Sequence, residues 1–217
     1  MLSKLRQAVS RALEGHARLA YRLGLRPNHV SALGLLWASL AALAYWRWRL
    51  LWPYVALSAP LLVLLSGYSD VLDGLIARLH GLASRSGAML DSMLDRYADV
   101  AIILGLWAGG LCGPLEALLA CSGSLLVSYA RARAESLGAE LAGVGLAERA
   151  ERLIIIIAAS WLELFWPGAL RLAVLLLAAL THITAIHRLA RAYSLLRTGV
   201  PETGAREGPP SAQGTRS

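Results

Sequence analysis

Apolar residues fill long stretches of this chain, and short breaks rich in Pro, Gly or charge separate them. Six such stretches lie at about residues 29–50, 53–80, 84–111, 114–137, 147–166 and 168–196. Each is near the ~20 apolar residues that a helix needs to cross a bilayer. The breaks include Trp52-Pro53, GGLCGP at 109–114 and WPG at 166–168, which are typical of helix ends. The pattern predicts six transmembrane helices.

Residues 1–27 and 198–217 differ from this central region, residues 28–197. Leucines between Leu2 and Leu23 recur at broadly helical spacing with Lys and Arg among them, which indicates an amphipathic helix on the membrane surface. The last segment is rich in Gly, Pro, Ser and Thr, and we expect it to be a disordered tail. The predicted fold is all-α, an integral membrane bundle of six transmembrane helices preceded by an amphipathic surface helix.

Composition agrees with a membrane protein, since 57% of the residues are hydrophobic and only 16% are charged. The formal net charge of +7 could suggest a nucleic-acid partner, but no soluble domain remains to carry it, so we expect none. If the N-terminus is cytosolic, the opposite face holds only Arg47, Arg49 and Arg171 of the 21 Lys and Arg residues. The positive-inside rule then predicts a multi-pass protein of the cell membrane with both termini in the cytoplasm.

Every aspartate of the chain lies between residues 70 and 99, inside the apolar region. Asp70 and Asp73 are three residues apart, and Asp91 and Asp95 are four apart, so each pair projects from one helix face. A short link joins the two predicted helices near residue 82, which makes them antiparallel neighbours. We therefore expect all four carboxylates to meet in the cytosolic half of the bundle, with Asp99 one turn deeper.

Four close carboxylates repel one another unless cations lie beside them. Hard divalent ions with oxygen ligands, Mg²⁺ or Mn²⁺, fit such a site best, and a pair of them suits phosphoryl transfer. A single intramembrane Asp is as readily explained by helix pairing or by an ion path. Four at this spacing favour a metal site formed by Asp70, Asp73, Asp91 and Asp95.

The pattern D-x-x-D-G-x-x-A-R-x8-G-x3-D-x3-D begins at Asp70 and resembles the signature of the CDP-alcohol phosphatidyltransferases at all eight fixed positions. That family also has six membrane helices and a surface helix, so the resemblance covers most of the chain. It implies a homodimeric transferase of the EC 2.7.8 class that binds two divalent ions and a CDP-linked lipid. An acceptor hydroxyl attacks the β-phosphate and CMP leaves, with Asp95 as both metal ligand and general base. The residues implied for CDP-lipid binding are Asn28, His29, Val30, Ser31, Gly74, Ala77, Arg78, Ser84 and Gly87.

The acceptor must be inferred from other residues. Cations gather at the predicted cytosolic ends of the last three helices, where they could form an anion site because Arg binds phosphate bidentately. Positive-inside anchoring also explains any single one of them. The candidate residues for the acceptor phosphate are Ser128, Arg131, Arg133, Arg149, Arg188 and Arg191, and Arg152 lies among them.

These stretches resemble the branch of the family that transfers to inositol 1-phosphate, the phosphatidylinositol phosphate synthases and the archaeal archaetidylinositol phosphate synthases. Two departures are Arg131, where Lys is equally at home, and Ser31, where Thr is commoner. The resemblance implies an active site that faces the cytoplasm, transfer of a phosphatidyl or archaetidyl group, and inositol 1-phosphate as acceptor.

Three other functions stay open at this point. Glycerol 3-phosphate is the alternative acceptor, because it too carries a phosphate. A membrane transporter with ion-coupled carboxylates is a different class of function. Inverted repeats would favour that class, and this sequence does not show such repeats. A lipid-binding scaffold without catalysis is the third, and the intact aspartates argue against it. The pattern does not decide between an ester-linked and an ether-linked donor lipid.

Overall fold

The computed structural model describes residues 2–141, 145 and 148–197, with side chains from Ala12 onward. Within these ranges the chain is helical, which confirms the all-α prediction for that part. The predicted tail, 198–217, lies outside the described residues. The helices are α1 (Leu2–Arg22), α2 (Pro27–Trp46), α3 (Trp48–Leu51), α4 (Tyr54–Leu79), α5 (Arg85–Ala108), α6 (Pro114–Ser136), α7 (Arg149–Leu162) and α8 (Ala169–Arg197).

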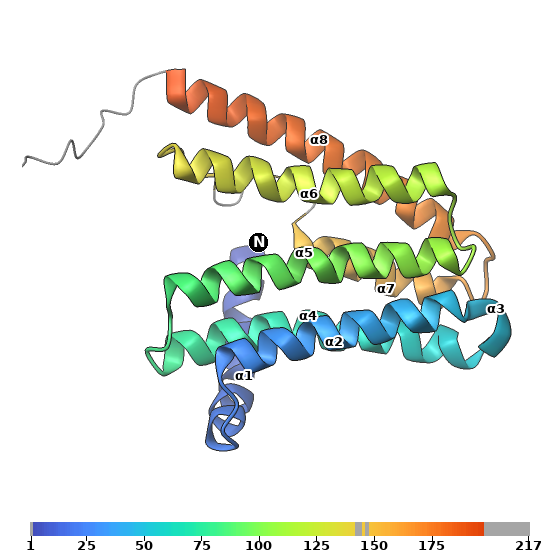
Figure 1. The fold of residues 1–217 in the computed structure, drawn as a ribbon, viewed down its shortest axis with the longest axis horizontal. Coiled ribbons are helices and arrows are strands. Elements are labelled where there is room, and N and C mark those ends of the chain that lie inside the picture. Colours follow the sequence, from blue (N-terminus) through green and yellow to red (C-terminus); the bar gives the residue numbers. More distant parts are fainter. Residues whose placement is uncertain (1, 142–144, 146–147, 198–217) are drawn as a thin grey trace, which may run out of the picture.

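The helices from α2 onward, except the short α3, run side by side as a bundle, and α1 lies across one end of it (Figure 1). Helix α2 packs against α4 and α5, α6 packs against α8, and α7 bridges α4 and α8. The α4–α5 link lies at the same end of the bundle as α1 (Figure 1). The end of α4 and the start of α5 therefore meet there, as the sequence predicts for the aspartates.

Two predicted helices are shorter in the structure. The stretch at 29–50 ends as a helix at Trp46, because the chain bends at Arg47 before α3 begins. In the described part of the stretch at 147–166, the helix covers the 14 residues of α7. Its end is fixed by Glu163, whose carboxylate accepts hydrogen bonds from the backbone N–H groups of Gly168 (2.8 Å) and Leu170 (2.7 Å). These bonds turn the chain into α8.

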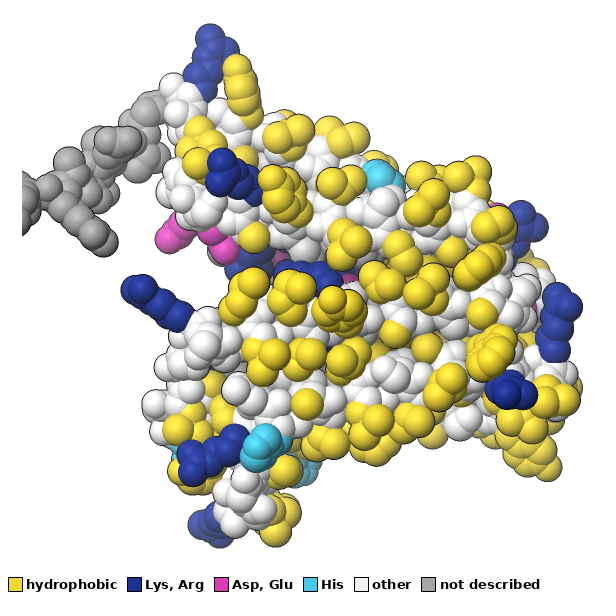
Figure 2. Space-filling view, viewed as in Figure 1, with side chains coloured by type: hydrophobic (Ala, Val, Ile, Leu, Met, Phe, Trp, Pro, Cys, Tyr) yellow, Lys and Arg dark blue, Asp and Glu magenta, His cyan; other side chains and the backbone are white. Residues whose placement is uncertain are grey.

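Three described helices, α2, α4 and α8, are long and apolar enough to cross a membrane. Helix α5 is long enough, but Asp91, Asp95, Arg96 and Asp99 interrupt its apolar sequence. Hydrophobic side chains cover most of the visible outer face between the two ends of the bundle (Figure 2). Such a surface suits lipid, since the outward leucines would otherwise face water.

Small residues let the helices approach closely around the site. A Cβ atom at Gly105 of α5 would lie 2.5 Å from the backbone of Ala42 on α2, so only glycine fits there. The core beside this contact contains Ala38 and Ala41 of α2, both fully buried. Close backbone approach between membrane helices commonly depends on such residues. Here the contact holds α5, and with it Asp91 and Asp95, against α2.

Candidate active site

Three aspartates from α4 and α5 converge near the α1 end of the bundle. Asp70, Asp91 and Asp95 each offer a carboxylate oxygen, and these oxygens lie within 4.8 Å of one another. All three residues are half-buried. Asp70 lies in the last turns of α4, while Asp91 and Asp95 lie on successive turns of α5. The predicted convergence of the two helices is therefore confirmed for these three residues.

Asp73 has a different environment from the other three. Its side chain is 5% exposed, and its Oδ2 accepts a hydrogen bond of 2.6 Å from the Ser31 hydroxyl of α2. The same hydroxyl lies 3.2 Å from the carbonyl oxygen of Pro27. Ser31 thus ties the start of α2 to the carboxylate cluster of α4.

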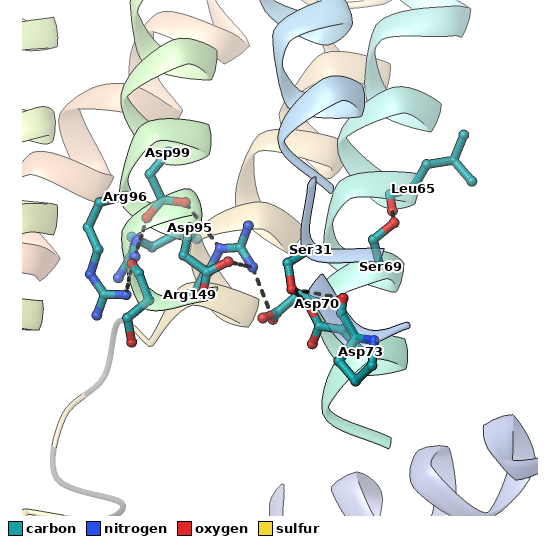
Figure 3. Close-up of polar contacts among 12 residues, drawn as sticks. Ser31, Leu65, Ser69, Asp70, Asp73, Asp95, Arg96, Asp99 and Arg149 are labelled. Atoms are coloured by element: carbon teal, nitrogen blue, oxygen red, sulfur yellow. Dashed lines mark hydrogen bonds and ion pairs between the residues drawn. The ribbon is translucent and has the colours of Figure 1, made fainter. Parts of the chain in front are cut away.

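Arg149, the first residue of α7, reaches into the cluster (Figure 3). Its Nη1 lies 3.0 Å from Asp70 and 2.7 Å from Asp95, and its Nε lies 3.4 Å from Asp99. Asp99 also pairs with Arg152 at 2.5 Å, and both of these side chains are buried. The cluster therefore joins α4, α5 and α7 through charged side chains.

The carboxylates border a narrow hollow that is open to the surface. Its lining consists of Ser31, Gly34, Leu35, Ser66, Asp70, Asp73, Leu94, Asp95 and Arg149. Carboxylate oxygens are the ligands that Mg²⁺ and Mn²⁺ prefer, and like charges this close need a cation beside them. The oxygen donors of Asp70, Asp91 and Asp95 therefore fit a divalent ion.

Several residues predicted for the CDP-lipid meet where α2 and α5 begin. The Ser84 hydroxyl caps α5 by accepting from the backbone N–H of Gly87 at 3.0 Å. A Cβ atom at Gly87 would lie 2.9 Å from that hydroxyl oxygen and 3.4 Å from Oδ1 of Asn28. Backbone N–H groups at helix starts favour anions, so this corner suits a phosphate group.

The other residues of that set lie around the end of α4 and the first turn of α2. A Cβ atom at Gly74 would lie 3.2 Å from Nη1 of Arg78, so the guanidinium covers the glycine one turn back. Ala77 is half-buried, Val30 is buried and His29 is exposed.

The residues predicted for the acceptor phosphate are not gathered at one point. Arg188 is 3% exposed, donates to the carbonyl of Val127 (2.9 Å) and lies 3.6 Å from Glu148. Its contact with Val127 places it beside Ser128 of α6. Arg131 pairs with Glu135 at 2.8 Å on the same helix. Arg149 instead contacts the carboxylate cluster, and Arg133 and Arg191 are exposed.

Asp99 had no role assigned from the sequence, and Arg152 was considered only as part of the basic pocket for the acceptor phosphate. Asp99 and Arg152 form a buried ion pair that extends the cluster toward α7. The signal for Asp99 was its position four residues after Asp95, on the same helix face. Ser66, one turn before Asp70, is fully buried and lines the hollow, and its hydroxyl has no hydrogen-bond partner among the residues that the structure describes.

Comparison with known proteins identifies the family of this chain. The sequence profile of the CDP-alcohol phosphatidyltransferases matches residues 25–186. This chain belongs to the CDP-alcohol phosphatidyltransferase family. Its members are transferases, so the chain is an enzyme of the EC 2.7.8 class and a multi-pass membrane protein.

One relative is the archaetidylinositol phosphate synthase of Methanothermobacter thermautotrophicus, which is 41% identical over 91% of this chain and 96% of its own length. Two crystal structures of the Mycobacterium tuberculosis phosphatidylinositol phosphate synthase are also similar. The one with CDP-DAG bound has a TM-score of 0.72 and 32% identity, covering 85% of this chain and 94% of that one. The one with manganese and citrate has a TM-score of 0.71 and 32% identity, covering 83% and 88%.

Proposed function

We propose that this enzyme transfers a phosphatidyl or archaetidyl group from a CDP-linked lipid to the hydroxyl of inositol 1-phosphate and releases CMP. The observation that carries the proposal is the carboxylate cluster of Asp70, Asp91 and Asp95 at the α4–α5 end of the bundle. Support for the acceptor comes from the relatives, which include an archaetidylinositol phosphate synthase and a phosphatidylinositol phosphate synthase. Glycerol 3-phosphate is the alternative acceptor.

The proposed membrane arrangement is six spanning helices, α2 and α4 to α8, with the carboxylate cluster facing the cytoplasm. Helices α5 and α6 have 24 and 23 residues, which is long enough to span. At 14 residues α7 is only about 21 Å long, so its crossing relies on the neighbouring turns. The charge asymmetry supports this orientation, since the far end of the bundle holds Arg47, Arg49 and Arg171.

The metal site would be formed by Asp70, Asp91 and Asp95 together with Asp73, and would hold two Mg²⁺ or Mn²⁺ ions. The relative's structure with manganese supports this choice of metal. Such ions, when bound, supply positive charge that neutralises the diphosphate oxygens and favours departure of CMP.

The chain's own residues bind the substrates and move the proton. Asn28, Ser84 and Gly87 lie together at the helix starts and, with Gly74 and Arg78, bind the CDP moiety. The relative with CDP-DAG bound supports a donor of this kind.

Asp95 takes the proton from the acceptor hydroxyl. The oxygen then forms a bond to the phosphorus next to the lipid, and the bond from that phosphorus to CMP breaks. Arg188 and Arg131 hold the acceptor phosphate beside Ser128, where bidentate arginine contacts suit a phosphate group.

The assignment of Asp95 as the base is tested by Asp95→Asn. A positioned base is worth roughly 10²–10⁴-fold, so turnover should fall by that factor. Binding of the CDP-lipid should change little, because Asp70 and Asp91 are retained. Turnover is measured as CMP released from CDP-lipid with inositol 1-phosphate, and Tyr97→Phe on the exposed side of α5 is the control. Near-normal turnover of Asp95→Asn would place the base elsewhere.

A further inference from the structure

The guanidinium of Arg149 lies where a cation shared by Asp70 and Asp95 would lie. Its Nη1 is 3.0 Å from one carboxylate and 2.7 Å from the other (Figure 3). The Arg149 side chain is 14% exposed, so water screens these ion pairs poorly. Two of the three carboxylates that fit a divalent ion are therefore paired with an internal cation.

The electrostatic cost of unpaired carboxylates favours a cation at the position of Arg149. Removing one partner from a buried ion pair leaves an uncompensated charge, which is strongly unfavourable. Without Arg149, the carboxylate oxygens of Asp70, Asp91 and Asp95 would lie within 4.8 Å of one another, and the ion pair that Arg149 makes with Asp70 would be lost. The guanidinium and a divalent ion would thus neutralise the same carboxylates. The presence of one cation therefore reduces the electrostatic stabilisation gained from the other.

A second partner is available to Arg149 at the edge of the cluster. Its Nε lies 3.4 Å from Oδ1 of Asp99, while Oδ2 of Asp99 is held by Arg152 at 2.5 Å. Asp99 is thus already in place beside the arginine, on the side of α7. A guanidinium that leaves Asp70 and Asp95 keeps a carboxylate partner.

We propose that Arg149 is the internal counter-ion of the metal site. It neutralises Asp70 and Asp95 before a divalent ion binds, competes with that ion, and is retained by Asp99 once displaced. The proposal rests on the proposed function, because it takes Asp70, Asp91 and Asp95 as the metal ligands.

Replacement of the Arg149 guanidinium by a divalent ion would change the environment of Asp95, the proposed base. While Arg149 lies 2.7 Å from Asp95, the carboxylate is engaged and poorly placed to accept a proton. Displacement of the guanidinium by the ion removes this ion pair from Asp95 and leaves the guanidinium between the carboxylate cluster and α7. Binding of the divalent ion and readiness of the base are therefore coupled through one side chain.

A purely structural role for Arg149 makes the opposite prediction. If the residue only ties α7 to α4 and α5, its loss should loosen the cluster and weaken binding of a divalent ion. A counter-ion that competes with the ion should, when removed, make binding tighter. The sign of the change in Mn²⁺ affinity separates the two roles without any measurement of turnover.

The test is Mn²⁺ binding to the purified, metal-free full-length protein in detergent, followed by the electron paramagnetic resonance signal of free Mn²⁺. Arg149→Gln should bind Mn²⁺ about tenfold more tightly or better, because charge-assisted contacts to two carboxylates no longer compete. Arg149→Lys keeps the charge without the fork and should fall between the two. The metal-free melting temperature of Arg149→Gln should drop, and Mn²⁺ should raise it by more than in the wild type.

Two controls fix the interpretation. Arg171→Gln removes the same charge from an exposed side chain that pairs with Glu116, far from the cluster, and should leave Mn²⁺ affinity unchanged. Asp70→Asn should weaken Mn²⁺ binding. Unchanged or weaker Mn²⁺ binding by Arg149→Gln overturns the counter-ion while the metal site stands. Absence of Mn²⁺ binding by the wild type, or no effect of Asp70→Asn, overturns the metal site and the counter-ion with it.

Discussion

Replacing Ser31 with alanine probes the contact between α2 and the carboxylate cluster. The Ser31 hydroxyl donates to Asp73 at 2.6 Å, and Asp73 is 5% exposed. A hydrogen bond to a charged group contributes roughly 1.5–3 kcal/mol, and here its loss leaves a buried carboxylate without this donor. Ser31→Ala should therefore shift the unfolding equilibrium by about tenfold to about a hundredfold, since ~1.4 kcal/mol is a factor of ten.

The assay is unfolding of the metal-free protein by titration with dodecyl sulfate in mixed micelles, followed by circular dichroism. Ser39→Ala is the matched control, because Ser39 lies on the same helix and, within the described part of the chain, its hydroxyl bonds only to the backbone carbonyl of Leu35 (2.9 Å). Ser31→Thr keeps a hydroxyl and should restore most of the lost stability. Equal effects of Ser31→Ala and Ser39→Ala would refute the reasoning, since the charged partner would then contribute nothing.

Three further predictions concern the metals, the acceptor and the packing. Excess EDTA should abolish CMP release and lower the melting temperature, and Mg²⁺ or Mn²⁺ but not Ca²⁺ should restore turnover, because Ca²⁺ is larger and less strict in geometry; full turnover in EDTA would contradict the metal site. Arg188→Gln should raise the acceptor KM about tenfold to about a hundredfold while the donor KM stays nearly constant, and Arg47→Gln at the far end should change neither; an equal rise in both KM values would argue against a phosphate contact. Gly105→Ala should lower stability in the same dodecyl sulfate titration by about 1–3 kcal/mol, because the added Cβ would lie 2.5 Å from the backbone of Ala42; wild-type stability would show that α2 and α5 are not in close contact.

Much of the fold follows from breaks in the apolar pattern. Pro114 begins α6 where the sequence predicts, and each of the six predicted stretches contains a long helix in the structure. The ends that differ depend on contacts the pattern does not contain. Helix α7 stops at Leu162 because Glu163 binds the backbone at the start of α8, and no periodicity encodes that contact.

The site was predictable where its residues are neighbours on one helix. Spacing along α5 is enough to align Asp91 and Asp95, and the short link to α4 is enough to bring Asp70 to them. Pairing across the bundle was not predictable in this way. Ser31 and Asp73 are 42 residues apart, and Arg149 approaches from α7. A basic residue near a helix start suggested an anion site, and only the packing of α7 against α4 directs Arg149 to the aspartates.

The position of Arg149 also connects the two halves of the proposed reaction. The residues proposed to bind the CDP-lipid lie at the starts of α2 and α5 and at the end of α4, whereas Ser128, Arg131 and Arg188 lie on α6 and α8. Between them are the carboxylate cluster and the Asp99–Arg152 ion pair. The proposed base, Asp95, and the proposed counter-ion, Arg149, would therefore lie where a donor phosphate and an acceptor hydroxyl meet.

The central claim is transfer to a phosphorylated inositol, and a competition between acceptors tests it most directly. The purified protein is supplied with CDP-lipid, Mg²⁺ and equal concentrations of inositol 1-phosphate and glycerol 3-phosphate, and the lipid products are identified by mass spectrometry. We expect the inositol phosphate lipid as the main product, and little product when unphosphorylated inositol is supplied alone, because it offers Arg188 and Arg131 no anion. Formation of the glycerophosphate lipid with no inositol phosphate lipid would leave the family assignment intact and contradict the acceptor.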